Sequence, residues 1–186
     1  MNPIKNKKDL ETTIEEIRNF AYSYLEKYSP SKQQLRIFLF KKLVKKNQKI
    51  SSKKEAFNLI DTVIASLIDQ KLLSDKVYSD SKSRAFLRRG YSLNKIRYNL
   101  IKKGIDEKYI KSSISKIKEE ESDPDFFSAI KLCKRRRIGP LREEPNRQLF
   151  YKKDMSILAR SGFSYDISKK VLETPKSEFK KFLKMI

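Results

Sequence analysis

Apolar residues recur every three or four positions along most of the chain, which is the period of an amphipathic helix with one buried face. Serine, aspartate, proline and glycine interrupt the pattern at short intervals, as is typical of helix ends. No run of alternating apolar residues is long enough to indicate a strand. The pattern therefore predicts an all-α protein with nine helices and a short tail helix after Pro175. The nine predicted ranges are 13–27, 31–46, 53–72, 74–90, 92–104, 106–120, 123–137, 146–160 and 164–173.

The segment from Ser92 to Gly104 shows this pattern most clearly. Ser92 is a good N-cap, because its hydroxyl can accept a hydrogen bond from the unpaired amides of the first turn. Gly104 can take the left-handed conformation that ends a helix. One face between them is apolar and is predicted to be buried (Leu93, Ile96, Leu100, Ile101), and another carries Lys95, Asn99, Lys102 and Lys103.

The helix signals repeat along the chain. Ser31 and Ser92 both begin a second helix and lie 61 residues apart (92 − 31 = 61), and Gly104 and Gly162 both end one and lie 58 apart (162 − 104 = 58). A period of about 60 residues indicates modules of three helices that each pack on their neighbours. We therefore predict a flexible basic tail over residues 1–12, followed by three-helix repeats over 13–73, 74–122 and 123–186.

The net charge narrows the possible partners. The chain has 44 Lys and Arg against 23 Asp and Glu, a formal charge of +21. Such a chain favours nucleic acid, an anionic membrane or an acidic protein. Its longest apolar run, Ile37–Phe40, is too short to span a bilayer, and the first residues do not resemble a signal peptide. Because the apolar stripes lie in short capped helices that can pack together, we expect no membrane partner.

Cysteine and histidine usage disfavours an enzyme. Cys133 is the only cysteine and there is no histidine, so neither a disulfide within the chain nor the usual zinc ligands are available. The chain also lacks the Gly-x-x-x-x-Gly-Lys pattern of a phosphate-binding loop. We expect a cytoplasmic, monomeric protein that is not an enzyme and has no cofactor or metal.

Three groups of cations are candidate contacts for a polyanion. The alternatives are a solvated helix face, and a helix C-terminus whose dipole favours cations. In chain order the candidates are Lys41, Lys42, Lys45, Lys46, then Arg84, Arg88, Arg89, Lys95, Arg97, Lys102, Lys103, then Lys131, Lys134, Arg135, Arg136 and Arg137.

Other polar and aromatic residues have a structural interpretation. Phe86, Tyr91 and Tyr98 could stack on bases, but filling gaps between helices is the commoner role. Asp123 is predicted to cap a helix that begins at Pro124. The alternative, a pair with Asp125 that binds a divalent cation, is disfavoured. Phe163 is expected in the core.

At this point the motifs resemble a known family. The run Leu72-Leu73-Ser74-Asp75-Lys76-Val77-Tyr78, followed by Arg84, Arg88, Gly90, Ile96-Arg97, Leu100 and Lys103-Gly104-Ile105, is similar to the central repeat of the RecX family, bacterial regulators of the RecA recombinase. The runs Arg135–Pro140 and Gly162–Ile167 and the pair Val171-Leu172 are similar to the alphaproteobacterial-type variant of that family. The resemblance covers about residues 20–173.

Two positions depart from the family pattern. The family usually has two acidic residues where this chain has Ser74-Asp75, so the first of that pair is lost. Leu43 stands where a glycine would end the second helix of the first repeat. This helix should therefore run longer than its counterpart.

The resemblance implies an elongated, curved array of three tandem three-helix repeats. It also implies binding in the groove of the RecA–DNA filament, inhibition of ATP turnover and strand exchange, and contact with single- and double-stranded DNA in recombination, repair and the SOS response. One alternative is a sequence-tolerant DNA-binding protein of tandem helix-turn-helix-like modules that acts without a recombinase. An enzyme such as a metal-dependent nuclease would need clustered acidic ligands, and the sequence shows none.

Overall fold

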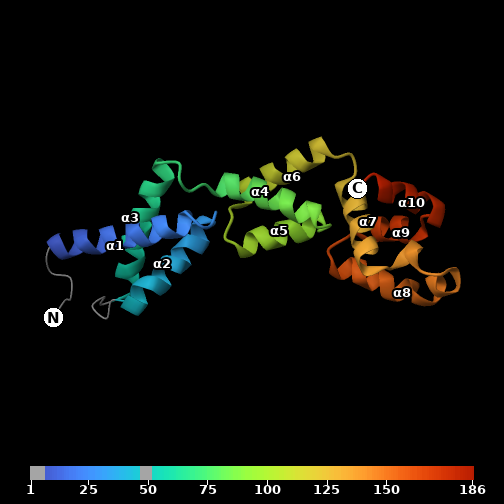
Figure 1. Cartoon of the computed structure of the whole chain (residues 1–186), viewed down its shortest axis with the longest axis horizontal. Helices are drawn as coiled ribbons and strands as arrows, with labels where there is room; N and C mark the ends of the chain where they lie inside the picture. The colour runs from blue at the N-terminus through green and yellow to red at the C-terminus, as the bar shows by residue number, and fades with distance from the viewer. Residues whose placement is uncertain (1–6, 47–51) are drawn as a thin grey trace. The chain divides into compact units, whose positions relative to one another are not determined.

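The protein is all-α, as predicted, in the part of the chain that the structure describes. This computed structural model describes the backbone of residues 7–46 and 52–186 and the side chains of residues 13–44 and 52–186. The predicted tail covers residues 1–12, of which residues 1–6 lie outside the described residues, as do residues 47–51 between the second and third predicted helices. Within the described ranges there is no strand (Figure 1). The helices are α1 (Lys7–Leu25), α2 (Lys32–Lys46), α3 (Lys53–Asp69), α4 (Asp75–Arg88), α5 (Leu93–Lys102), α6 (Glu107–Glu120), α7 (Pro124–Arg136), the 3₁₀-helix η1 (Gly139–Leu141), α8 (Glu144–Arg160), α9 (Tyr165–Glu173) and α10 (Lys176–Lys184).

The chain divides into two compact units. The first unit runs to Tyr78 and includes the turn Lys103–Asp106, and the second contains Ser79–Lys102 and Glu107–Ile186. Each unit has its own buried apolar cluster. The boundaries of the three predicted repeats, at 73/74 and 122/123, stay predictions.

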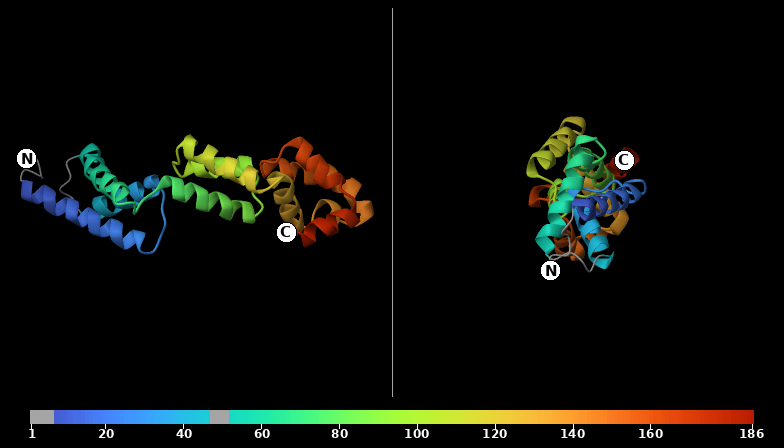
Figure 2. Two further views of the ribbon diagram at one scale, coloured as in Figure 1. Left: turned by 90° about the horizontal axis from the view of Figure 1, so that it is seen from above. Right: turned by 90° about the vertical axis from the view of Figure 1, so that its left-hand side faces the viewer.

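The first unit is built on three mutually packed helices, α1, α2 and α3, which Figure 2 shows from two further sides. Leu39 of α2 and Ile60 of α3 are 1% and 0% exposed. Aromatic pairs extend this core: the rings of Tyr24 and Phe38 stack with centroids 4.0 Å apart. The faces that the three helices turn toward one another therefore follow the predicted apolar periodicity, except at Ile68 of α3, which was predicted inward and is 41% exposed.

Helix α2 runs longer than α5, as the missing glycine predicted. Leu43 is 1% exposed and helical, and α2 continues to Lys46. The structure corrects two other boundaries. Helix α1 begins at Lys7 rather than residue 13, since no proline or glycine interrupts residues 7–13. Helix α3 ends at Asp69 rather than residue 72, because Lys71 adopts a positive φ of 60° and the Leu72 amide bonds back to Leu67.

The second unit buries an apolar cluster among α7, α8, α9 and α10. Phe126, Leu158 and Phe179 lie in this cluster, and Phe163 joins them at 5% exposed, which confirms its predicted place in the core. The tail helix after Pro175 is confirmed as α10. The sequence reading missed η1, and it placed the start of α8 at residue 146 rather than at Glu144.

Small polar residues hold α4 against α6. The hydroxyls of Ser79 and Ser113 lie 2.8 Å apart, Ser113 donates to Asp80 at 2.6 Å, and Lys116 forms an ion pair with Asp80 at 2.7 Å. Burial raises the pKa of Asp80, but the hydrogen bonds from Lys116 and Ser113 outweigh it and bring this pKa below its usual value. Asp80 therefore stays ionised at neutral pH and keeps its ion pair with Lys116.

Cys133 lies inside the core of the second unit. It is 0% exposed, and burial, with a smaller effect from Asp154, raises the pKa of its thiol to about 12. The thiol therefore stays protonated and unreactive while the unit is folded.

Within the described ranges, no helix combines the length and the apolar character needed to cross a bilayer. Nor do the described residues bring together three or more acidic or cysteine side chains in a group that could hold a metal ion.

Candidate nucleic-acid interface

Each unit contains the same contact between a serine cap and a glycine turn. Ser31 accepts from the amide of Gln34 at 3.2 Å and donates its hydroxyl to the carbonyl of Lys103, just before Gly104, at 2.7 Å. In the second unit, Ser92 accepts from the amide of Lys95 at 3.2 Å and donates to the carbonyl of Ser161 at 2.8 Å. Both serines were predicted as caps, and the structure confirms them.

An aspartate completes each contact. Asp75 accepts from the amide of Lys32 at 2.8 Å, and Asp125 accepts from the amide of Leu93 at 2.8 Å. These amides begin α2 and α5 and would otherwise lack a partner. Burial raises the pKa of Asp125, and the hydrogen bond from Leu93 offsets part of this effect. Asp125 is thus a helix cap from a neighbouring element, and Asp123 caps α7 through the amide of Phe126 as predicted.

The contacts of the second unit bring the ends of α4 and α7 together. The Arg135 guanidinium donates to the carbonyl of Arg89 at 2.8 Å. Gly90 has a φ of 75°, and a Cβ there would lie 2.9 Å from the Cβ of Lys131 and 3.0 Å from the carbonyl oxygen of Ser128. The turn after α4 therefore lies directly against α7 (Figure 1).

Six predicted cations lie at or next to the C-terminal ends of these two helices, and we name them the α4–α7 cationic cluster. All six are exposed, and both helices present their C-terminal ends there, where the helix dipole favours positive charge. Among the described residues, no acidic side chain forms an ion pair with any of them. The members are Arg88, Arg89, Lys134, Arg135, Arg136 and Arg137.

Two other candidate cations already have acidic partners. Arg84 pairs with Glu120 at 2.5 Å, and Arg97 pairs with Glu107 at 3.0 Å. Arg36 of the first unit forms the corresponding bond, a two-pronged contact with Asp61 at 2.7 Å, which raises the pKa of the Arg36 guanidinium. The sequence could not show these pairings, because each joins residues on different helices.

The aromatic residues near the cluster contact one another. The Phe86 and Tyr91 rings stack with centroids 5.3 Å apart, and the Lys95 ammonium lies 5.0 Å from the Tyr91 centroid. Lys95 and Lys131 are both half-buried. Tyr98 differs, since its side chain is 57% exposed.

The remaining candidates lie elsewhere. Lys41 and Lys42 are exposed on α2, and the side chains of Lys45 and Lys46 lie outside those that the structure describes. Lys102 ends α5 and Lys103 follows it, and both are exposed.

The backbone of Arg137 adopts an unfavourable conformation. It caps α7 with a φ of 53°, in the left-handed region that favours glycine. Replacing Arg137 by glycine is expected to stabilise the second unit by about 0.5–1 kcal/mol, because the strain of the left-handed conformation outweighs the added flexibility of the unfolded chain. If the cluster binds phosphates, the same change should weaken DNA binding several-fold, because about one phosphate contact is lost.

Lys71 supplies the matched control, because it is exposed and has a φ of 60° outside the cluster. Lys71→Gly should give a similar gain in stability in urea unfolding and leave DNA affinity unchanged. Equal losses of DNA affinity in the two variants would argue against a role for Arg137.

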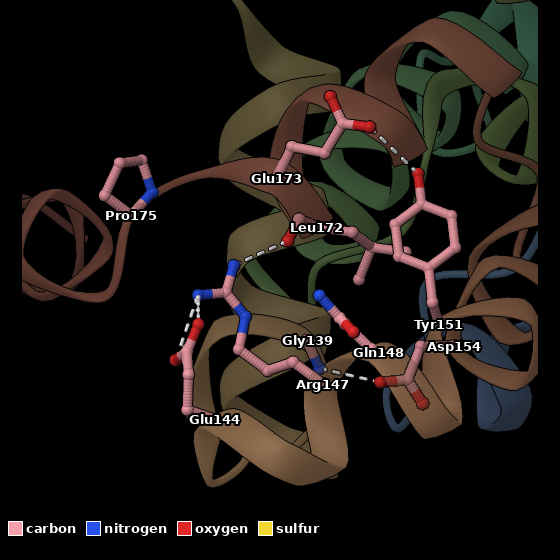
Figure 3. A pocket seen from close by; sticks show the side chains of 9 residues that line it. All are labelled: Gly139, Glu144, Arg147, Gln148, Tyr151, Asp154, Leu172, Glu173 and Pro175. Carbon is pink, nitrogen blue, oxygen red and sulfur yellow. Dashed lines mark hydrogen bonds and ion pairs between the residues drawn. The ribbon is translucent and has the colours of Figure 1, made fainter.

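A pocket of about 670 Å³ lies beside α8, α9 and η1 (Figure 3). Arg147 donates to the carbonyls of Leu172 and Thr174 at 2.9 and 3.1 Å, and Tyr151 donates to Glu173 at 3.2 Å. These polar groups on the wall pair with one another and hold the end of α9 against α8. We therefore assign this pocket a structural role.

Comparisons with known proteins identify the chain's relatives. No protein-family model matches it. A regulatory protein RecX of Myxococcus xanthus (strain DK1622) is 29% identical over 160 residues, which are 85% of this chain and 84% of that protein. A regulatory protein RecX of Clostridioides difficile (strain 630) is 31% identical over 133 residues, or 69% of this chain and 58% of that protein. The chain belongs to the RecX family.

Solved structures of RecX proteins have the same fold. The crystal structure of RecX from Lactobacillus salivarius matches with a TM-score of 0.62 and 22% identity, over 95% of this chain and 99% of that one. A crystal structure of a regulatory protein RecX matches with a TM-score of 0.64 and 19% identity, over 91% of this chain and 78% of that one. Both support the helical repeat fold described above.

Proposed function

We propose that this RecX-family protein regulates the RecA recombinase by binding in the groove of the RecA–DNA filament, where it lowers ATP turnover and strand exchange. Its α4–α7 cationic cluster contacts DNA phosphates in that complex. The protein acts as a cytoplasmic, monomeric regulator of recombination and repair rather than as an enzyme.

The observation that carries the proposal is the α4–α7 cationic cluster itself. The Arg135–Arg89 hydrogen bond holds two cationic helix ends together from positions 46 residues apart. Exposed guanidinium and ammonium groups that form no ion pair with a described acidic side chain suit the phosphate backbone, whose contacts supply most of the affinity for nucleic acid. Because such contacts carry no sequence information, they fit a partner that assembles on any DNA sequence.

The proposal is tested by titrating the protein into RecA filaments on single-stranded DNA. The DNA-dependent ATPase should fall at no more than about one protein per recombinase subunit at low salt, and binding should weaken steeply as salt rises. An unchanged ATPase and unchanged strand exchange with excess protein would contradict the proposal.

Affinity for naked DNA distinguishes the proposed function from the alternative, a DNA-binding protein that needs no recombinase. Binding to naked DNA at physiological salt as tight as binding to the filament would favour that alternative. Much tighter binding to the filament would support a protein partner in addition to phosphates.

A further inference from the structure

Helices α2 and α5 present similar exposed surfaces at equivalent positions. When Ser31 is aligned with Ser92, 61 residues further on, Ile37 corresponds to Tyr98 and Lys41 to Lys102. Ile37 and Tyr98 are 45% and 57% exposed, and both lysines are exposed. The same combination of an apolar side chain and a cation is thus presented once by each unit.

Each surface continues along its helix. On α2, Val44 is 53% exposed and lies two turns from Ile37. On α5, Ile101 is 49% exposed and lies next to Tyr98, so its predicted place in the buried stripe was wrong. Residues three, four and seven apart share one helix face. We name the two surfaces the α2 face (Ile37, Lys41, Val44) and the α5 face (Tyr98, Ile101, Lys102).

The orientation of each helix is fixed by its other contacts. Leu39 of α2 and Leu100 of α5 are 1% and 0% exposed, because they pack into the cores of their units. The ion pairs of Arg36 with Asp61 and of Arg97 with Glu107 secure a second side of each helix. The apolar residues of the two faces are therefore held in solvent by helices that cannot rotate to bury them.

The composition of the two faces differs from that of the α4–α7 cationic cluster. The cluster contains only cations, which suffice for phosphates. The faces combine apolar side chains with cations, and on α5 the Lys102 ammonium lies 4.6 Å from the centroid of the Tyr98 ring. Among the described residues, no acidic side chain forms an ion pair with Lys41 or Lys102. This combination complements a protein surface in which carboxylates surround apolar side chains.

We infer that the α2 face and the α5 face dock on such an acidic, partly apolar surface of the recombinase subunits, while the α4–α7 cationic cluster takes the DNA phosphates. This inference rests on the proposed function. A filament presents the same surface on every subunit, and the chain offers a matching face in each of its two units. Protein contacts would then supply the preference for a filament over naked DNA.

The test removes the apolar side chains and keeps every charge. In the double variant Ile37→Ser/Tyr98→Ser, the concentration that half-inhibits the RecA ATPase should rise by about tenfold or more, as is common when an anchoring side chain leaves an interface. Affinity for naked DNA should stay within about twofold, because no phosphate contact is lost. Melting temperature should stay near that of the wild type, since both side chains are exposed.

The matched control is Val77→Ser/Leu149→Ser, which removes one apolar side chain from each unit at sites 67% and 74% exposed and outside both faces. This control should inhibit like the wild type. The conservative variant Ile37→Leu/Tyr98→Phe should restore inhibition, which would exclude misfolding as the cause of the loss.

Two outcomes would overturn the inference. An equal loss of affinity for naked DNA would mean that the faces meet nucleic acid, with Tyr98 stacking on bases. Full inhibition by Ile37→Ser/Tyr98→Ser would mean that the faces bind nothing. Failure of the proposed function is a separate result, since wild-type protein itself would then leave the ATPase unchanged.

Discussion

Replacement of Asp154 by alanine is expected to lower the free energy of unfolding of the second unit by about 3–5 kcal/mol, the usual cost of breaking a buried ion pair. Asp154 is 1% exposed and accepts three hydrogen bonds: from the Gly139 amide at 2.9 Å and from the Arg142 guanidinium at 2.7 and 2.8 Å. The carboxylate raises the pKa of Arg142 through these bonds. Its removal would leave the buried Gly139 amide without its acceptor and the Arg142 guanidinium, whose side chain is 20% exposed, without its counter-ion.

Cys133 offers a local measurement of this loss. Its buried thiol reacts only when the second unit opens, so a loss of 3–5 kcal/mol should speed labelling at pH 8 by roughly a hundredfold to a few thousandfold. Urea unfolding followed by circular dichroism gives an independent value. A rate increase below about fivefold would contradict a stabilising role for Asp154.

Asp61→Ala is the matched control. Asp61 makes the same two-pronged contact with an arginine, at 2.7 Å for both bonds, but its side chain is 43% exposed. Exposed pairs contribute only about 0.2–1 kcal/mol. Similar losses in the two variants would mean that burial does not set the strength of these bonds.

The buried ion pair of Asp154 was not predicted from the sequence. Alignment of Gly162 with Gly104 places Asp154 opposite Ile96, a fully buried residue of α5 (154 − 58 = 96). A carboxylate at an apolar position of a helix signals a buried partner, and this signal was available in the sequence. The sequence did not reveal its partners, because Gly139 begins the 3₁₀-helix η1 and Arg142 caps it, and periodicity does not show so short a helix.

The features that the sequence predicted correctly are governed by neighbouring residues. Gly90, Gly104 and Gly162 all have positive φ angles and follow helices, and Ser92 caps α5. Capping and termination depend on a few adjacent backbone groups, so residue type at a fixed position is enough to predict them.

The candidate site depended instead on contacts between distant segments. The sequence suggested separate cationic groups, whereas the structure joins the ends of α4 and α7 and pairs Arg84 and Arg97 with glutamates. Contacts of this kind require the packing of whole helices, which local pattern does not encode. Neither the sequence nor the structure tests whether these cations bind DNA, so their role in binding stays a prediction.

Neutralising the α4–α7 cationic cluster is expected to have the largest effect on binding. The triple variant Arg88→Gln/Lys134→Gln/Arg136→Gln should lower affinity for duplex DNA about 100-fold at about 0.1 M salt and reduce the slope of log affinity against log salt by about 2.7, or 0.9 for each lost phosphate contact. The three side chains are exposed, so the stability cost is limited to their helix-dipole interactions, about 0.3–1 kcal/mol each.

The control removes the same charge elsewhere in the same unit. Lys152→Gln/Lys169→Gln/Lys180→Gln changes three exposed lysines of α8, α9 and α10 that lie outside the cluster. If the cluster is a phosphate site, this control should bind DNA with nearly wild-type affinity and inhibit the RecA ATPase normally, while the cluster variant loses both. Equal losses would mean that only net charge matters, because long-range attraction depends on total charge and local phosphate contacts depend on position.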